Sequence, residues 1–159
     1  MKEYPLFFES GGPIFGDGYV VSVVVRGRVL ATWDEDDGEF VLSGVNPGSL
    51  LGFGRTLNEA YQYMVESLRC VLIDIATDAA TVEEFRREAD DFFGTDAPEC
   101  RARWESARER VRQGELRNDL DLRVETSDPE FGMFVEQVER PSVHANAPAQ
   151  SLAPSAIAA

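Results

Sequence analysis

The pattern of apolar and polar residues predicts β-strands over the first third of the chain. Residues 19–25 form a continuous β-branched run, which is typical of a strand that is covered on both faces. Residues 39–45 alternate instead, with Phe40 and Leu42 on one face and polar neighbours on the other. Shorter strands are predicted at 6–8, 29–33 and 50–53.

Turn residues between these strands predict an antiparallel meander. The glycines and proline of 11–18 indicate a loop, and Arg26-Gly27 indicates a turn. Asp37-Gly38 suits the positive φ angles of a hairpin, and Asn46-Pro47-Gly48 reverses the chain again. We therefore expect one sheet of roughly four to six strands.

Helical spacing replaces alternation after Gly54. Thr56 and Glu59 have the spacing of a capping box, in which each side chain bonds the backbone amide of the other residue. An apolar stripe follows and predicts a long amphipathic helix over 57–76 that packs on one face of the sheet. The stripe consists of Leu57, Ala60, Tyr61, Met64, Val65, Leu68, Val71, Leu72 and Ile75.

Two further helices and two strands are predicted after the long helix. A second capping box at Thr81 begins the first of these helices, and 99–114 forms the next, with Trp104 on its apolar side. The strands are predicted at 120–125 and 131–138, where they either extend the sheet or pair as a hairpin.

Together these elements predict an α+β fold: an antiparallel β-meander packed on one long amphipathic helix, with additional C-terminal helices and strands. Residues 1–140 are expected to form a single domain, with a core at about 19–76 and an extension at 77–140. Residues 141–159 carry no formal charge and consist largely of Ala, Pro and Ser. We expect this segment to be a disordered tail, because it has too little apolar surface to offset the entropy of ordering.

The net charge of the chain narrows the classes of molecule that it is expected to bind. The chain has a net charge of −14, from 29 acidic and 15 basic residues. Such a field repels phosphate backbones and anionic lipids and attracts cationic partners, so we expect neither direct DNA binding nor membrane association. Cys70 lies among apolar residues and is predicted to be in the core. The number and spacing of Cys70 and Cys100 suggest no disulfide framework or zinc site, which favours the cytoplasm.

Acidic residues gather at the predicted turn between the second and third strands of the meander. An EF-hand loop would need a distal bidentate glutamate, which is missing here. The remaining interpretations are a solvated hairpin turn and an acidic patch that faces a partner. We expect no metal and no cofactor. The residues are Asp34, Glu35, Asp36, Asp37 and Glu39.

The one basic island lies on the third predicted helix. Neighbouring glutamates at helical spacing predict a salt-bridged, solvated surface, and the alternatives are self-association or an RNA contact. Its candidate residues are Arg101, Arg103, Arg108, Arg110 and Arg112. Tyr63 falls off the apolar stripe that contains Tyr61, which makes Tyr63 a second candidate for contact with a partner. His144 is the only histidine and lies in the predicted tail, so we expect no histidine-based acid–base catalysis.

Residues from about 34 to 75 resemble the HicB-like antitoxin domain, which has a partial RNase H-type fold. The matching motifs are Asp37-Gly38, Pro47-Gly48 and Gly54-Arg55-Thr56-Leu57-Asn58-Glu59-Ala60. The resemblance implies a non-catalytic protein whose sheet-and-helix domain binds and masks a small basic RNase toxin, within a homo-oligomer. These antitoxins often carry a C-terminal helix-turn-helix or ribbon-helix-helix, and this chain shows neither pattern.

Two functions are therefore predicted. The first is a non-enzymatic acidic protein-binding module, resembling a HicB-like antitoxin, that masks a basic protein partner through the acidic turn and Tyr63. The alternative is a component of a defence system: an immunity protein, an inhibitor or a scaffold subunit, whose acidic surface mimics nucleic acid or engages a larger effector complex. We expect no enzymatic activity from either.

Overall fold

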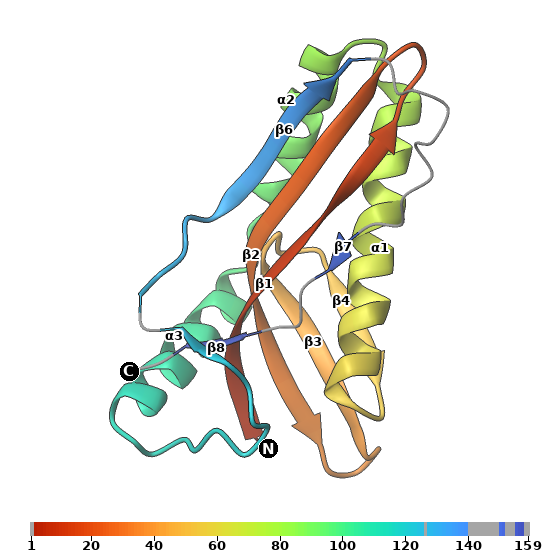
Figure 1. The fold of residues 1–159 in the computed structure, drawn as a ribbon. Helices are drawn as coiled ribbons and strands as arrows, with labels where there is room; N and C mark the ends of the chain where they lie inside the picture. Colours follow the sequence, from red (N-terminus) through yellow and green to blue (C-terminus); the bar gives the residue numbers. More distant parts are fainter. Residues whose placement is uncertain (1, 126, 140–149, 152–154, 158–159) are drawn as a thin grey trace.

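One mostly antiparallel sheet and three helices make up the part of the protein that the structure describes, and they form the α+β fold that the sequence predicts (Figure 1). The structure is a computed structural model and describes residues 2–125, 127–139, 150–151 and 155–157. His144 and the other tail residues at 140–149 lie outside the described residues, as do 152–154 and 158–159.

The strands predicted at 19–25 and 29–33 are joined into one strand. Four N-terminal strands form the antiparallel meander. They are β1 Lys2–Phe15, β2 Val20–Asp34, β3 Glu39–Asn46 and β4 Leu51–Gly54. Each strand pairs antiparallel with the next, and β4 ends the sheet on its side. Gly38 has a φ angle of 65° in the turn after β2, which confirms the predicted Asp-Gly hairpin.

β2 is the central strand of the sheet. Its residues 20–33 pair with β1 along one edge. On its other edge, residues 28–34 pair with β3, and residues 20–26 pair with β6, which spans Gly132–Val138. The late strand predicted at 131–138 therefore extends the sheet and does not form a hairpin with 120–125.

Three short strands lie beyond the outer edge of β1. They are β5 Val124–Glu125, β7 Gln150–Ser151 and β8 Ser155–Ile157. β7 and β8 pair with β1, and β5 pairs parallel with β8. The strand predicted at 120–125 is thus reduced to two residues, and two parts of the predicted disordered tail are strands. The open edge of β1 explains the tail strands, because its backbone groups can pair with any sequence.

Helices cover both faces of the sheet. α1 Leu57–Asp78 and α2 Val82–Phe93 pack over the main core on one face. α3 Pro98–Arg112 packs on the opposite face, at the end of the β1–β2 hairpin that holds the N-terminus (Figure 1). The smaller core beneath α3 contains Phe7, Leu30, Val45, Trp104 and Ala107. No helix among the described residues is long and apolar enough to cross a membrane.

The beginning of α1 confirms the predicted capping box. The backbone N–H of Glu59 donates to Oγ1 of Thr56 at 3.1 Å, and the N–H of Thr56 donates to Oε2 of Glu59 at 3.2 Å. The apolar stripe of α1 is buried or half-buried against the sheet. α1 approaches β4 so closely that a Cβ at Gly52 would lie 2.3 Å from the Ala60 carbonyl oxygen. Glycine in β4 is therefore needed for this contact.

The loop predicted at 11–18 is wrong over residues 11–15, because residues 2–15 form one strand. Gly11, Gly12 and Pro13 stay within β1, where they pair with residues 22–24 of β2. Pairing along a long partner strand holds these glycines extended. Pro13 lies beyond the residues of β1 that pair with β7 and β8, so its missing N–H breaks none of those pairings.

The predicted turn at Arg26-Gly27 is also wrong, because β2 continues through both residues. A Cβ at Gly27 would lie 2.1 Å from the carbonyl oxygen of Asn46 and 2.5 Å from the Phe8 ring. Gly27 therefore permits close packing rather than chain reversal. The pairing of β2 with β3 is irregular one residue later, where a bulge shifts the register between Arg28 and Val29.

Cys70 is exposed and is not part of the core, contrary to the prediction. Its neighbours Leu68 and Leu72 lie on the buried stripe of α1. A residue two positions from each of them lies on the opposite side of a helix, which explains the exposure.

Candidate functional site

The acidic turn between β2 and β3 is locally ordered by one of its own carboxylates. Oδ1 of Asp34 accepts the backbone N–H of Asp36 at 2.9 Å and that of Asp37 at 3.3 Å. Glu35, Asp36 and Asp37 are exposed, whereas Asp34 and Glu39 are half-buried at the ends of the two strands. The turn therefore presents its negative charge to solvent on a fixed backbone.

A hollow of about 190 Å³ lies at this turn. It is lined by Trp33, Asp34, Glu35 and Asp36. The ring of Phe40 packs against the ring of Trp33, with the two ring centroids 4.8 Å apart. In the part of the chain that the structure describes, no group of three or more His, Cys, Asp or Glu side chains is arranged to hold a metal ion.

Exposed apolar side chains gather beside the acidic turn, on β4 and α1. Leu51 and Phe53 of β4 are 48% and 42% exposed, and Tyr63 of α1 is 56% exposed. The rings of Phe53 and Tyr63 meet edge to face with their centroids 5.9 Å apart. We call these three residues the β4 patch. Tyr63 is thus accessible, as expected for a contact with a partner, while Tyr61 is buried.

Strand register places the β4 patch at the same corner of the sheet as the acidic turn. Phe53 pairs with Val41, and Gly54 pairs with Phe40, the residue after Glu39. Glu39 and Val41 lie on the same face of β3, so the Glu39 side chain is a diagonal neighbour of Phe53. On α1, Glu66 is exposed one turn beyond Tyr63. The corner therefore combines exposed apolar area with a surrounding of negative charge.

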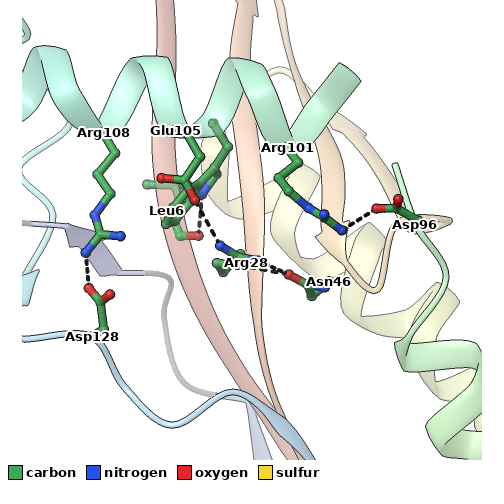
Figure 2. Close-up of polar contacts among 9 residues, drawn as sticks. Leu6, Arg28, Asn46, Asp96, Arg101, Glu105, Arg108 and Asp128 are labelled. Carbon is green, nitrogen blue, oxygen red and sulfur yellow. Dashed lines mark hydrogen bonds and ion pairs between the residues drawn. The ribbon is translucent and has the colours of Figure 1, made fainter. Parts of the chain in front are cut away.

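The arginines of α3 are largely engaged within the chain. Arg101 pairs with Asp96 and Arg108 pairs with Asp128 (Figure 2). Arg103 pairs with Glu3. These contacts compensate most of the positive charge that the sequence shows on this helix.

Exposure differs among these arginines. The Arg108 side chain is only 14% exposed and lies over the Trp104 ring. Arg112 lies 3.9 Å from Glu109, and Arg110 is exposed.

Arg28 of β2 is a half-buried cation that the sequence analysis did not select. Its guanidinium lies between the rings of Trp104 and Phe131, 4.9 and 5.1 Å from their centroids. Nε donates to Oδ1 of Asn46 at 2.9 Å, and Nη1 lies 3.3 Å from Oε1 of Glu105 (Figure 2). Burial lowers the pKa of Arg28. No local sequence signal identifies this residue, because its partners come from three other segments of the chain.

Cys100 lies at the start of α3, half-buried against the sheet. Its Sγ donates to the carbonyl oxygen of Ser43 at 3.4 Å, and burial raises the pKa of the thiol. A raised pKa leaves less thiolate at neutral pH, which disfavours a nucleophilic role. Between β1 and α1, the apolar pocket lined by residues such as Ile14, Val25 and Leu68 has a volume of about 20 Å³. It is large enough for about one water molecule.

The described geometry thus presents one charged and apolar corner, formed by the acidic turn and the β4 patch. Comparisons with protein-family models, with curated proteins and with solved structures found no match to the chain.

Proposed function

We propose that the protein is a non-enzymatic binding module whose acidic corner masks a basic protein partner, in the manner of a HicB-like antitoxin. The observation that carries the proposal is the meeting of the acidic turn with the β4 patch at one corner of the sheet. Exposed carboxylates steer a cationic partner, and exposed aromatic and aliphatic groups provide area that association removes from water.

The two parts of the corner have separable effects on binding. Charges at a rim chiefly change the association rate and its salt dependence, whereas a packed aromatic group chiefly changes the dissociation rate. The acidic turn is thus expected to determine the association rate constant of the partner, and Phe53 and Tyr63 are expected to determine its dissociation rate constant.

The test begins with affinity capture of the tagged chain from its native cells, followed by kinetic measurements with the captured basic protein. Neutralising the acidic turn is expected to lower the association rate constant by about tenfold or more and to flatten its salt dependence. The five substitutions are Asp34→Asn, Glu35→Gln, Asp36→Asn, Asp37→Asn and Glu39→Gln. Asp34→Asn retains Oδ1 and with it the acceptor for the turn amides.

A matched control neutralises five exposed carboxylates on α1 and α2: Asp74, Asp78, Glu83, Asp90 and Asp91. This variant has the same change in net charge and is expected to lose much less of the association rate. Equal losses in both variants would show that total charge, and not the acidic turn, attracts the partner. Recovery of a large effector complex without a small basic protein would instead support the defence-system alternative.

A further inference from the structure

None of the described helices covers the outer face of the sheet at the end that lies away from α3. Along β2, Val21, Val23 and Val25 are buried under α1 and α2, while Val20 and Val24 point to the other face and are only half-buried. Figure 1 shows β6 beside this half of β2, with α3 at the opposite end of the hairpin. The continuous apolar run 19–25 predicts a strand that is covered on both faces, yet the described chain covers only one.

Strand register defines the uncovered face row by row. Phe15 pairs with Val20, which pairs with Val138, and Val24 pairs with Phe134 on β6. Phe15 and Val138 are 46% and 38% exposed. We call this surface the β1–β2–β6 face. Its apolar side chains are Pro13, Phe15, Val20, Val24, Phe134 and Val138.

The charge of this face differs from that of the rest of the molecule. Glu9 and Arg26 lie on it and pair with each other at 2.9 Å, and the Arg26 guanidinium lies 5.3 Å from the Phe134 ring centroid. Among the described residues of the face, Glu136 is the only other charged side chain. A nearly neutral apolar surface on a chain of net charge −14 can meet its own copy without the repulsion that other faces would produce.

We propose that the β1–β2–β6 face is the interface of a symmetric homodimer. A twofold axis through the face would stack two sheets and bury the outer side chains of residues 20–24 between them. The acidic turn lies at the other end of β2, a strand of 15 residues. At about 3.3 Å per residue the two ends are roughly 45 Å apart, so the dimer leaves both acidic corners free. The proposal does not depend on the function proposed above.

Sedimentation velocity of the full chain over a range of concentrations tests the proposal. We expect a reversible monomer–dimer equilibrium that strengthens when salt screens the net charge. Phe15→Lys and Val138→Lys, made separately, should each weaken dimerisation by at least about tenfold, since a twofold axis places each new charge at the interface twice. Both positions are exposed in the monomer, and a thermal melt of each variant checks that it folds.

Ile73→Lys on α1 is the matched control, because Ile73 is 40% exposed and lies away from this face. It should leave the dimer unchanged. A chain that stays monomeric at high concentration and high salt overturns the proposal. So does a dimer that withstands both Phe15→Lys and Val138→Lys, or one that is lost in Phe53→Lys, which would assign the interface to the β4 patch. Dimerisation only after replacement of residues 140–149 by a Gly-Ser linker would show that this segment, and not a second copy, occupies the face.

Discussion

Tyr19 ties the start of β2 to the end of α1. Its hydroxyl lies 3.0 Å from the carbonyl oxygens of both Ala76 and Ala79, to which it donates. These acceptors are at the last turn of α1, where carbonyl groups lack partners within the helix. Burial raises the pKa of Tyr19, and the negative charge of Glu84 adds to the effect.

We expect Tyr19→Phe to lower stability at pH 8 by about 1 kcal/mol, through loss of the hydroxyl contact. Because the pKa of Tyr19 is raised on folding, the native chain holds this proton more tightly than the unfolded chain does. Its contribution is therefore complete below the unfolded value of 10.0 and is lost as pH rises above it. The variant should lose less stability than the wild type between about pH 9 and pH 11.

Urea unfolding at several pH values measures this difference. The pKa of Tyr4 is also raised by burial, so Tyr19→Phe should reduce the alkaline loss without abolishing it. An unchanged pH dependence in the variant would mean that the hydroxyl of Tyr19 does not retain its proton through the contact with α1.

At the scale of residues, the sequence predicts what depends on near neighbours. The capping box of Thr56 and Glu59 and the positive φ angle of Gly38 are confirmed, because both follow from interactions within a few residues. The partial burial of Arg28 is not predictable in this way. Its surroundings include Trp104 and Phe131, and nothing near Arg28 in the chain specifies them.

At the scale of elements, α3 is attached to the sheet by a mixed polar and aromatic contact. Trp104 is fully buried and donates its indole N–H to the carbonyl oxygen of Leu6 at 3.4 Å. Arg28 lies under the same ring and reaches Glu105 on α3 and Asn46 at the end of β3. One cation thus joins a helix to two strands, and its removal leaves several partners unsatisfied.

We expect Arg28→Met to destabilise the chain by about 1–3 kcal/mol, because Met keeps much of the packing between the rings but leaves Asn46 and Glu105 without the guanidinium. Arg101→Met on α3 is the matched control, since Arg101 is exposed and its pair with Asp96 should contribute roughly 0–1 kcal/mol. Chemical denaturation measures both. Similar losses in the two variants would contradict a structural role for the Arg28 contact.

The boundaries of the strands are predicted less well from the sequence than those of the helices. Glycine and proline in residues 11–13 predict a loop, and Gly27 predicts a turn, yet all lie within long strands. In each case a distant partner decides the outcome: β2 pairs along the whole of β1, and Phe8 and Asn46 occupy the space beside Gly27. Local propensity is outweighed here by tertiary contact. The helices are predicted better, because their apolar periodicity is contained in their own sequence.

At the scale of the whole molecule, β2 pairs with two different strands along one edge. β3 takes its second half and β6 its first half, while β1 runs along the opposite edge. β2 is therefore paired on both edges. Among the described residues β6 pairs with β2 alone, and its last three residues are exposed. Stability is expected to be distributed unevenly between these strands.

Native-state hydrogen exchange followed by mass spectrometry measures this distribution. Peptides from residues 20–34 should exchange at least about tenfold more slowly than peptides from 132–138, because β6 can detach without opening β1 and β2. Equal protection of the two segments would mean that β6 opens only with the whole sheet, and that the fold is one cooperative unit.

The candidate binding corner was predicted in part. Charge and turn chemistry identify the acidic turn, and helical periodicity places Tyr63 off the buried stripe. Leu51 and Phe53 were predicted only as strand residues, because their exposure depends on β4 being the last strand on that side. Whether a partner occupies this corner stays a prediction.

The division of β2 also implies an order of events during synthesis. β1 to β4 and α1 come from the first 78 residues, so their pairing partners are made together. β6 is made much later, and until it arrives the first half of β2 has an unpaired edge rich in valine. Nascent chains fold from the N-terminus as they emerge, and open strand edges promote aggregation. Ribosome-bound chains that end before Gly132 should therefore be the species that most needs a chaperone.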